Sequence, residues 1–245
     1  MLPNNYEIKE RVGKGSFGQV FRAIDKQSSR VVAVKIIELE DSTDDMDDIR
    51  QEIRTLATLR SKWVIEYYAS FVKNTSLWIV MEYCSAGSCL DMMKKYGVFN
   101  QTLVAIIMRE CLNGLDYLHS HGKIHRDIKA ANVLLTETGN VKLADFGVSG
   151  QITATISKKN TFVGTPYWIA PEVILRSTYN SKADIWSLGI TCWELLHGLP
   201  PNAHIHPMKV LFKIPKEKPP RLPDTYPKPI SDFVAKCLEM KQNLV

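Results

Sequence analysis

The hydrophobic pattern of the chain changes near Cys84, and this change limits the folds that the chain can adopt. Before this point, several short segments are rich in β-branched residues or alternate apolar and polar residues, as strands do: YEIKERV, QVFRAID, VVAVKII and SLWIVMEYC. After Leu90, longer segments have the period of helices: TLVAIIMRECLNGLDYLHSH, KADIWSLGITCWELLHG and ISDFVAKCL. Short strands are expected at NVLLT and VKLAD. We therefore predict a sheet-rich unit, then a helical unit, with a cleft between them.

One segment of the first part departs from the strand pattern. The run DSTDDMDDIRQEIRTLATL begins with acidic residues and continues with Ile49, Ile53, Leu56 and Leu59 at helical spacing. Acidic side chains favour the start of a helix because they interact with the positive end of its dipole. We predict a helix here and interpret the acidic run as its solvated entrance rather than as a docking site.

Composition limits the class of protein. The chain has 245 residues, of which 45% are hydrophobic and 23% charged, which is enough for a buried core. A net charge of +5 does not by itself indicate a nucleic-acid partner. The five cysteines form no CxxC pair, and no apolar run is long enough to span a membrane or act as a signal core. We therefore expect a cytoplasmic protein without membrane insertion.

The segment GKGSFGQV contains Gly13, Gly15 and Gly18 in the spacing G-x-G-x-x-G. Glycines allow backbone N–H groups to approach phosphate oxygens closely, but this spacing alone is weak evidence for a nucleotide site. A dinucleotide-binding fold would place the glycines between a strand and a helix, with an acid such as Glu38 on the next strand. Here the glycines lie between two predicted strands, so that interpretation is not favoured.

Two further segments carry charged groups in unusual places. Lys35 lies in the apolar strand VVAVKII, where an ammonium group is costly unless it is paired, and Glu52 in the predicted helix is the natural partner. The segment HRDIKAAN places Asp127, Lys129 and Asn132 within a few residues of one another, and DFG begins at Asp145. A carboxylate, a cation and an amide this close together are unusual for a plain loop.

Taken in order, these motifs resemble those of the eukaryotic protein kinases: GxGxxGxV, VAVK, a helix glutamate, HRDIKxxN, DFG and APE at Ala170–Glu172. Lys129 and the segment GTPYW resemble the serine/threonine type, and KKNTFVGTPYWIAPEVI resembles the germinal-centre branch of the sterile-twenty-like kinases. The resemblance implies a bilobal α+β fold. An antiparallel-sheet lobe with the hinge would occupy residues 1–84, and a large helical lobe for catalysis and substrate binding would occupy residues 85–245, incomplete at its end.

The resemblance also implies roles for individual residues. Asp127 would orient a substrate hydroxyl and accept its proton, Lys129 would neutralise charge on the γ-phosphate, and Asn132 and Asp145 would bind Mg²⁺. The cofactors would be ATP and Mg²⁺, and the reaction phosphorylation of protein serine or threonine in intracellular signalling. The implied ATP site consists of Val12, Gly13, Gly15, Gly18, Val20, Ala33, Lys35, Glu52, Met81, Glu82, Cys84 and Leu134.

The same resemblance implies how the kinase is activated and which residues hold the loop around Asp127. Thr161 corresponds to an activating threonine, and its phosphate would pair with Arg126, with Lys158 or Lys159 as a second cation. Besides protein substrates, a scaffold or activator protein is a possible partner, whereas nucleic acid is not expected.

Asp184 would hold the backbone before Asp127. Thr165 would hydrogen-bond near the catalytic loop.

Two structural interpretations compete with chemical ones. His125 and Phe146 would pack in a hydrophobic column with Leu56 rather than act in acid–base chemistry. His204 and His206 lie on a polar loop without a nearby cysteine or acid, so a metal site is not favoured there.

The end of the chain departs from the kinase pattern. The segment EMKQNLV lacks the aspartate–proline turn and the arginine that would pair with Glu172. We therefore expect an unpaired Glu172 and exposed apolar side chains at Phe233, Val234 and Leu238. The alternative function is a catalytically weak or truncated kinase fold that acts as a nucleotide-binding scaffold. Against it, the chain has kept the VAVK lysine and the aspartates of HRD and DFG.

Overall fold

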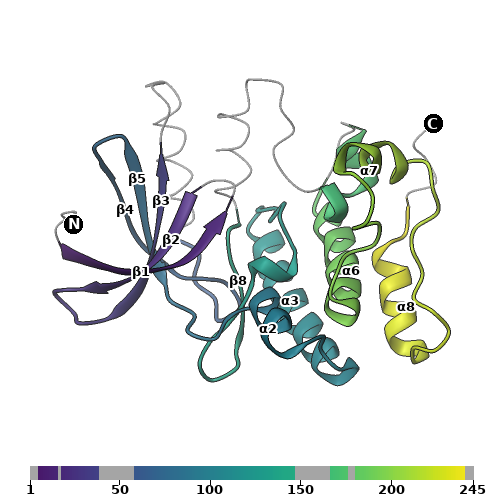
Figure 1. Cartoon of the computed structure of the whole chain (residues 1–245), viewed down its shortest axis with the longest axis horizontal. Helices are drawn as coiled ribbons and strands as arrows, with labels where there is room; N and C mark the ends of the chain where they lie inside the picture. Colours follow the sequence, from purple (N-terminus) through teal and green to yellow (C-terminus); the bar gives the residue numbers. More distant parts are fainter. Residues whose placement is uncertain (1–4, 16–17, 39–57, 147–165, 176–179, 241–245) are drawn as a thin grey trace. The chain divides into compact units, whose positions relative to one another are not determined.

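The computed structural model describes residues 5–15, 18–38, 58–146, 166–175 and 180–240 of the chain (Figure 1). The chain divides into two compact units. The described residues of the first, here called the sheet unit, lie between 5 and 85. Those of the second, the helical unit, are 86–146, 166–175 and 180–240.

Several predicted features lie outside the described residues. They include most of the helix expected after residue 40, together with the residues Glu52, Leu56, Lys158, Lys159, Thr161 and Thr165. The predicted end of that helix is described, and there the prediction was wrong. Thr58 lies in a turn and Leu59 is a buried residue outside any helix.

The sheet unit contains one antiparallel sheet, with strands in the order β1-β2-β3-β5-β4. Two of its turns use left-handed backbone at polar residues. Ser29 between β2 and β3 has φ 57°, and Asn74 between β4 and β5 has φ 53°. All four strands predicted from the sequence before Cys84 are present. The strands are β1 (Tyr6–Gly15), β2 (Gly18–Asp25), β3 (Val31–Glu38), β4 (Tyr67–Lys73) and β5 (Ser76–Glu82).

The two faces of this sheet carry different residues. On one face, a core cluster is formed by Ala23, Val32, Val34 and Val80 together with Tyr6. Because side chains alternate along a strand, the neighbours of these residues point to the opposite face. β3 is buried on both faces, which explains its continuous apolar sequence.

The helical unit is built around one helix that is buried along most of its length. This helix, α6, packs against α2, α3, α8 and two 3₁₀ turns. Buried residues lie on all sides of it, as expected for a central helix. The helices are α2 (Cys89–Tyr96), α3 (Gln101–Ser120), α5 (Pro171–Ile174), α6 (Lys182–His197), α7 (Pro207–Lys213) and α8 (Lys228–Cys237).

Short elements surround the loop that contains Asp127. Strands β6 (Gly87–Ser88), β7 (Val133–Leu135) and β8 (Val141–Leu143) form a small antiparallel sheet in the order β6-β7-β8. The two 3₁₀ turns are η2 (Ala130–Asn132) and η3 (Pro166–Trp168). The strands expected at NVLLT and VKLAD are therefore present.

Two expectations from composition concern the cysteines and the membrane-spanning segments. All five cysteines are buried and outside any disulfide. Burial raises the pKa of Cys89, Cys192 and Cys237 to about 12, so these thiols stay protonated at neutral pH. Within the described ranges, we found no helix with the length and hydropathy needed to cross a membrane.

The packing of α8 on α6 overturns one prediction. Val234 is 0% exposed and Leu238 is 1% exposed, although both were expected on the surface, and only Phe233 is partly exposed. The apolar side of α8 packs toward Gly189 of α6, where a Cβ atom would lie 2.7 Å from Cys237 Cβ and 3.0 Å from Leu238 Cδ2. The two helices therefore approach closely because position 189 has no side chain.

We predict that Gly189→Ala destabilises the protein by about 1–3 kcal/mol, because the added methyl group overpacks this contact. A glycine-to-alanine change inside a helix would otherwise be stabilising, so a loss isolates the steric effect. Lys236→Ala, on the exposed side of α8, is the control and should change stability by less than about 0.5 kcal/mol. Urea unfolding measures both. A Gly189→Ala protein at least as stable as the original would contradict the close packing.

Candidate active site

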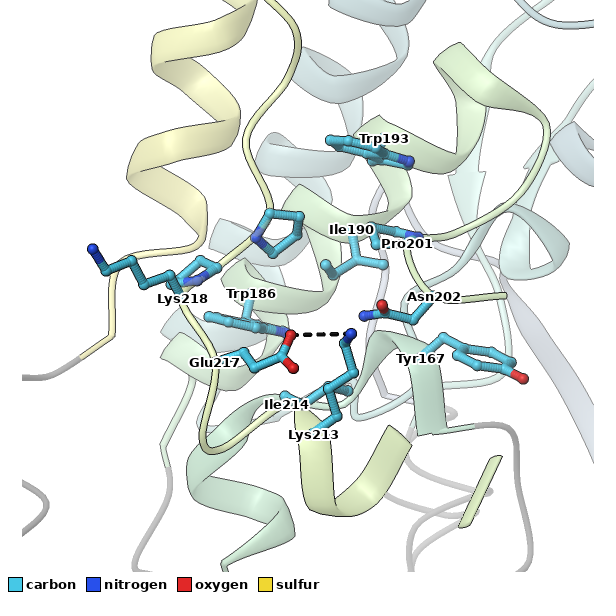
Figure 2. Close-up of a pocket in the computed structure, with 12 residues that line it drawn as sticks. Tyr167, Trp186, Ile190, Trp193, Pro201, Asn202, Lys213, Ile214, Glu217 and Lys218 are labelled. Atoms are coloured by element: carbon cyan, nitrogen blue, oxygen red, sulfur yellow. Dashed lines mark ion pairs between the residues drawn. The ribbon is translucent and has the colours of Figure 1, made fainter. Parts of the chain in front are cut away.

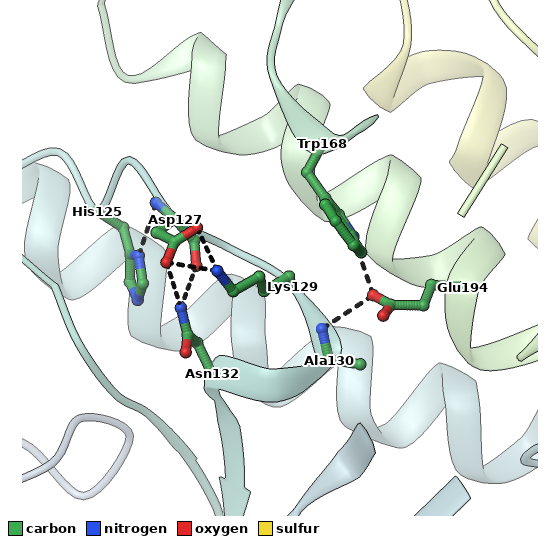
Figure 3. A network of polar contacts seen from close by, with 7 residues as sticks. All are labelled: His125, Asp127, Lys129, Ala130, Asn132, Trp168 and Glu194. Carbon is green, nitrogen blue, oxygen red and sulfur yellow. Dashed lines mark hydrogen bonds and ion pairs between the residues drawn. The ribbon is translucent and has the colours of Figure 1, made fainter. Parts of the chain in front are cut away.

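The acid, cation and amide of the HRDIKAAN segment meet in the helical unit (Figure 3). Lys129 Nζ lies 2.9 and 2.8 Å from the two carboxylate oxygens of Asp127. Asn132 Nδ2 donates to the Asp127 carbonyl oxygen at 2.7 Å and to its Oδ2 at 2.8 Å. The η2 turn produces this arrangement, since it folds the chain back between Lys129 and Asn132. The Asp127 carboxylate is thus held in one orientation while about a third of the side chain stays exposed (32%).

The β7–β8 hairpin brings the DFG segment to the same loop. The Ala144 N–H donates to the Asn132 carbonyl oxygen at 2.9 Å, and Asp145 follows directly with a left-handed φ of 62°. Such a backbone is uncommon for a residue other than glycine and is typical of functional sites. The two residues expected to bind Mg²⁺ therefore belong to hydrogen-bonded neighbouring segments.

The donor set of these two residues fits Mg²⁺. The Asn132 amide nitrogen is used by Asp127, and within the described residues no hydrogen bond reaches the amide oxygen, which is thus available to a cation. Asp145 adds a carboxylate. Mg²⁺ favours oxygen ligands and binds through few protein groups together with substrate phosphates. Accordingly, the described ranges contain no cluster of three or more His, Cys, Asp or Glu side chains that could hold a metal ion alone.

Asp184 of α6 fixes the backbone immediately before Asp127, as the resemblance to kinases implied. The side chain is 1% exposed, and its oxygens accept the N–H groups of His125 and Arg126, each at 2.8 Å. Arg126 has a left-handed φ of 71°, so the turn requires such support. His119 Nε2 is a further partner of Asp184, at 2.7 Å, and was not foreseen.

The charge state of Asp184 follows from these partners. Burial alone raises the pKa of its carboxyl, but the hydrogen bonds from His119 and from the two backbone N–H groups outweigh burial. The net pKa lies below its ordinary value, so Asp184 is a carboxylate at neutral pH.

His125 has a structural role, as expected. It is 0% exposed, and its ring lies 6.1 Å from that of Phe146, tilted by 51°. Its Nδ1 accepts the Asp127 N–H at 3.3 Å. Burial lowers the pKa of His125, against the charges of Asp184, Asp127 and Asp145, so the ring is neutral. A neutral ring with an accepting Nδ1 helps to position Asp127.

Glu194 of α6 was missed in the sequence, although it holds the other end of the loop that carries Asp127 and Lys129 (Figure 3). It is 3% exposed, and its Oε2 accepts the Ala130 N–H and the Trp168 Nε1–H, both at 2.9 Å. It therefore joins the residue after Lys129 to the η3 turn. The available signal was an acid within the apolar run GITCWELL, since a buried acid needs partners.

We predict that ionisation of Glu194 lowers the stability of the folded chain as the pH rises. Burial raises the pKa of its carboxyl above 4.5, although Ala130, Trp168 and the charge of Lys129 oppose the change. A raised pKa in an acid gives stability that is complete below the unfolded-state pKa and is lost as pH rises through the folded-state value. Glu194→Gln keeps an acceptor oxygen and cannot ionise. Its unfolding free energy relative to the original chain should therefore increase between about pH 4 and pH 7.

Urea unfolding at several pH values measures this difference, and a relative decrease toward neutral pH would contradict the assignment. Glu194→Leu is the control, because it leaves the Ala130 and Trp168 donors without an acceptor. It should lose about 1–3 kcal/mol over the same pH range.

The sheet unit gathers four of the other predicted residues on one face. Val20 lies opposite Lys35, and Ala33 lies opposite Met81, in neighbouring strands. Since Ala33 and Lys35 are two residues apart, all four side chains share the face opposite the core cluster. Lys35 is only 4% exposed. The predicted pairing of Lys35 with Glu52 lies outside the described residues.

The glycines of the same set lie in the β1–β2 hairpin. Gly13 is opposite Val20, and Gly15 is opposite Gly18. Gly18 has φ 144°, and a Cβ atom there would clash with the Ile36 carbonyl oxygen, so only glycine fits. Val12 is 44% exposed in β1.

The remaining members of the set lie in two places. Glu82 ends β5 and Cys84 follows it as a buried residue of the sheet unit. Leu134 belongs to the helical unit, in β7, two residues after Asn132.

Comparison with known proteins completes the description of this site. A model of the protein kinase domain family matches residues 6–244. The chain is 52% identical over 235 residues to serine/threonine-protein kinase dst1 of Dictyostelium discoideum. The aligned region covers 95% of this chain and 32% of that protein.

Two proteins of Schizosaccharomyces pombe are similar to a comparable degree. Serine/threonine-protein kinase ppk11 is 51% identical over 240 residues, covering 98% of this chain and 77% of that protein. Serine/threonine-protein kinase sid1 is 49% identical over 242 residues, covering 98% of this chain and 51% of that protein. The chain thus spans about a third of dst1 and about half of sid1.

Proposed function

Because this chain belongs to the protein kinase family, we propose that it transfers the γ-phosphate of ATP to serine and threonine hydroxyls of proteins. The observation that carries the proposal is the Asp127 carboxylate, which Lys129 and Asn132 hold in one orientation. The names of the relatives support the serine/threonine class. The segment KKNTFVGTPYWIAPEVI supports the germinal-centre branch.

The chemistry assigns one task to each group of the loop. Asp127 accepts a hydrogen bond from the substrate hydroxyl and orients its oxygen toward the γ-phosphorus. As that oxygen bonds to phosphorus, the bond to the β–γ bridging oxygen breaks, and ADP leaves. The hydroxyl proton passes to Asp127, and the Lys129 ammonium offsets negative charge on the transferred group. Bound Mg²⁺ would neutralise phosphate charge, held by the Asn132 amide oxygen and the Asp145 carboxylate.

The nucleotide would be bound by the residues of the sheet unit. The glycine hairpin offers backbone N–H groups to phosphate oxygens, and the Lys35 ammonium, paired with Glu52, would contact the α- and β-phosphates. Val20, Ala33 and Met81 offer an apolar surface for adenine. The backbone between Glu82 and Cys84 would supply hydrogen bonds to the adenine edge, and Val12 would flank the base.

We predict that Asp127→Asn lowers phosphate transfer by at least about 10²-fold, because it removes the proton acceptor. Nucleotide binding should persist, since the side chain contacts no nucleotide. The assay measures labelled phosphate from ATP in a basic protein, and nucleotide-induced thermal stabilisation measures binding. Asp224→Asn, the same change on an exposed loop, is the control. Unchanged turnover in Asp127→Asn would refute the role assigned to Asp127, whereas nucleotide binding without any transfer by the original chain would favour the nucleotide-binding scaffold.

The wider setting of the reaction belongs to the same proposal. We place the protein in cytoplasmic signalling, with other proteins as substrates and with a scaffold or activator protein as a partner. The buried cysteines outside any disulfide support a reducing compartment.

We further propose that phosphorylation of Thr161 activates the enzyme. Arg126 offers an exposed guanidinium next to Asp127, and phosphate matches its donors. Thr161→Ala should therefore lower kcat strongly, whereas Thr153→Ala, in the same segment, should not. Mass spectrometry of active protein identifies the modified residue. Unmodified Thr161 together with full activity of Thr161→Ala would exclude this switch.

A further inference from the structure

We propose that a pocket of the helical unit, separate from the residues around Asp127, binds a small aromatic or branched carboxylate (Figure 2). The pocket lies among η3, α6, α7 and the proline-rich segment after α7, and its volume is about 300 Å³. That volume is within the range of small-molecule sites, at its lower end. None of its lining residues belongs to the catalytic loop, so the proposal is independent of the phosphate-transfer chemistry.

The apolar walls of this pocket are held in place by contacts outside it. The Tyr167 hydroxyl donates to the Ile205 carbonyl oxygen at 2.7 Å, which leaves the ring to form a wall. The Trp193 ring stacks on His197 with centroids 4.4 Å apart and planes 18° apart. Pro219 and Pro220 add rigid rings. Flat, fixed walls of this kind suit a flat or branched apolar body and cost little ordering on binding.

The pocket also contains a buried donor without an acceptor. Trp186 is 5% exposed, and in the described part of the chain its Nε1–H finds no hydrogen-bond partner. A buried indole N–H usually has one, because the group loses its hydrogen bond to water on burial. Trp186 lines the pocket, and Figure 2 shows its indole nitrogen turned to the side where Lys213 and Glu217 lie. A ligand that carries an acceptor oxygen would satisfy this donor.

The charges at the pocket favour an anionic acceptor. Lys213 Nζ lies 3.1 Å from Glu217 Oε2, one turn along the chain, whereas the Lys218 side chain extends away from this pair (Figure 2). The Glu217 side chain is 58% exposed, so the ion pair is weak and Lys213 can turn to a ligand carboxylate. The recognised group is therefore a carboxylate on a compact apolar body.

The test uses the indole N–H resonances of the full chain, which has five tryptophans. Phenylacetate is the probe, phenylacetamide is its uncharged counterpart, and Trp186→Phe assigns the resonance. We expect a saturable downfield shift of the Trp186 indole proton with a dissociation constant of about 1 mM, a value usual for a ligand of this size. Phenylacetamide should bind several-fold more weakly. The signals of Trp63 and Trp78, in the sheet unit, should not move.

Two surface variants test whether the charge of Lys213, rather than a change in the fold, determines binding of the probe. Lys213→Gln should weaken phenylacetate binding several-fold and leave phenylacetamide binding unchanged. Lys216→Gln, three residues along and outside the pocket lining, is the matched control and should bind both probes normally. No shift of the Trp186 signal at about 10 mM phenylacetate, ten times the expected constant, would overturn the proposal. Equal shifts at Trp63 and Trp78 would also overturn it, since they indicate unspecific binding.

Discussion

Two buried carboxylates on one helix hold the loop that carries Asp127, at points on either side of that residue. Asp184 accepts the backbone N–H groups of His125 and Arg126, and Glu194 accepts that of Ala130. Both acids lie on α6, which is itself fixed by packing against α3 and α8. Because a buried carboxylate is costly without donors, each acid and the loop stabilise each other. The position of Asp127 therefore depends on the packing of α6.

The two acids differ in their electrostatics for a simple reason. Asp184 has three donors, two from the backbone and one from His119, and these lower the pKa of its carboxyl despite burial. Glu194 has two donors on a single oxygen, and burial keeps its pKa raised. Asp184 therefore binds the Arg126 end of the loop, where the backbone is left-handed, more strongly than Glu194 binds the other end. The other end is joined through Trp168 to the η3 turn, whose Tyr167 lines the proposed carboxylate pocket.

The sequence alone determined those parts of the molecule that depend on near neighbours. Alternation and β-branched runs located β1, β2, β3 and β5 of the sheet unit but not β4, and helical period located α3, α6 and α8. The contacts among Asp127, Lys129 and Asn132 could be expected too, because these residues lie within one short turn. Spacing and residue type are sufficient there, since the backbone of a few residues can bring the groups together.

Only the tertiary structure decided which distant groups meet. Glu194 was missed because its donors come from Ala130 and Trp168, which no local pattern connects to α6. Val234 and Leu238 were expected to be exposed, but Gly189 lets α8 approach α6 and covers them. The Trp186 donor became visible only once η3, α6 and the segment after α7 had formed a pocket around it. Burial and partner choice arise from packing between segments far apart in the chain, and a pattern along the chain does not contain that information.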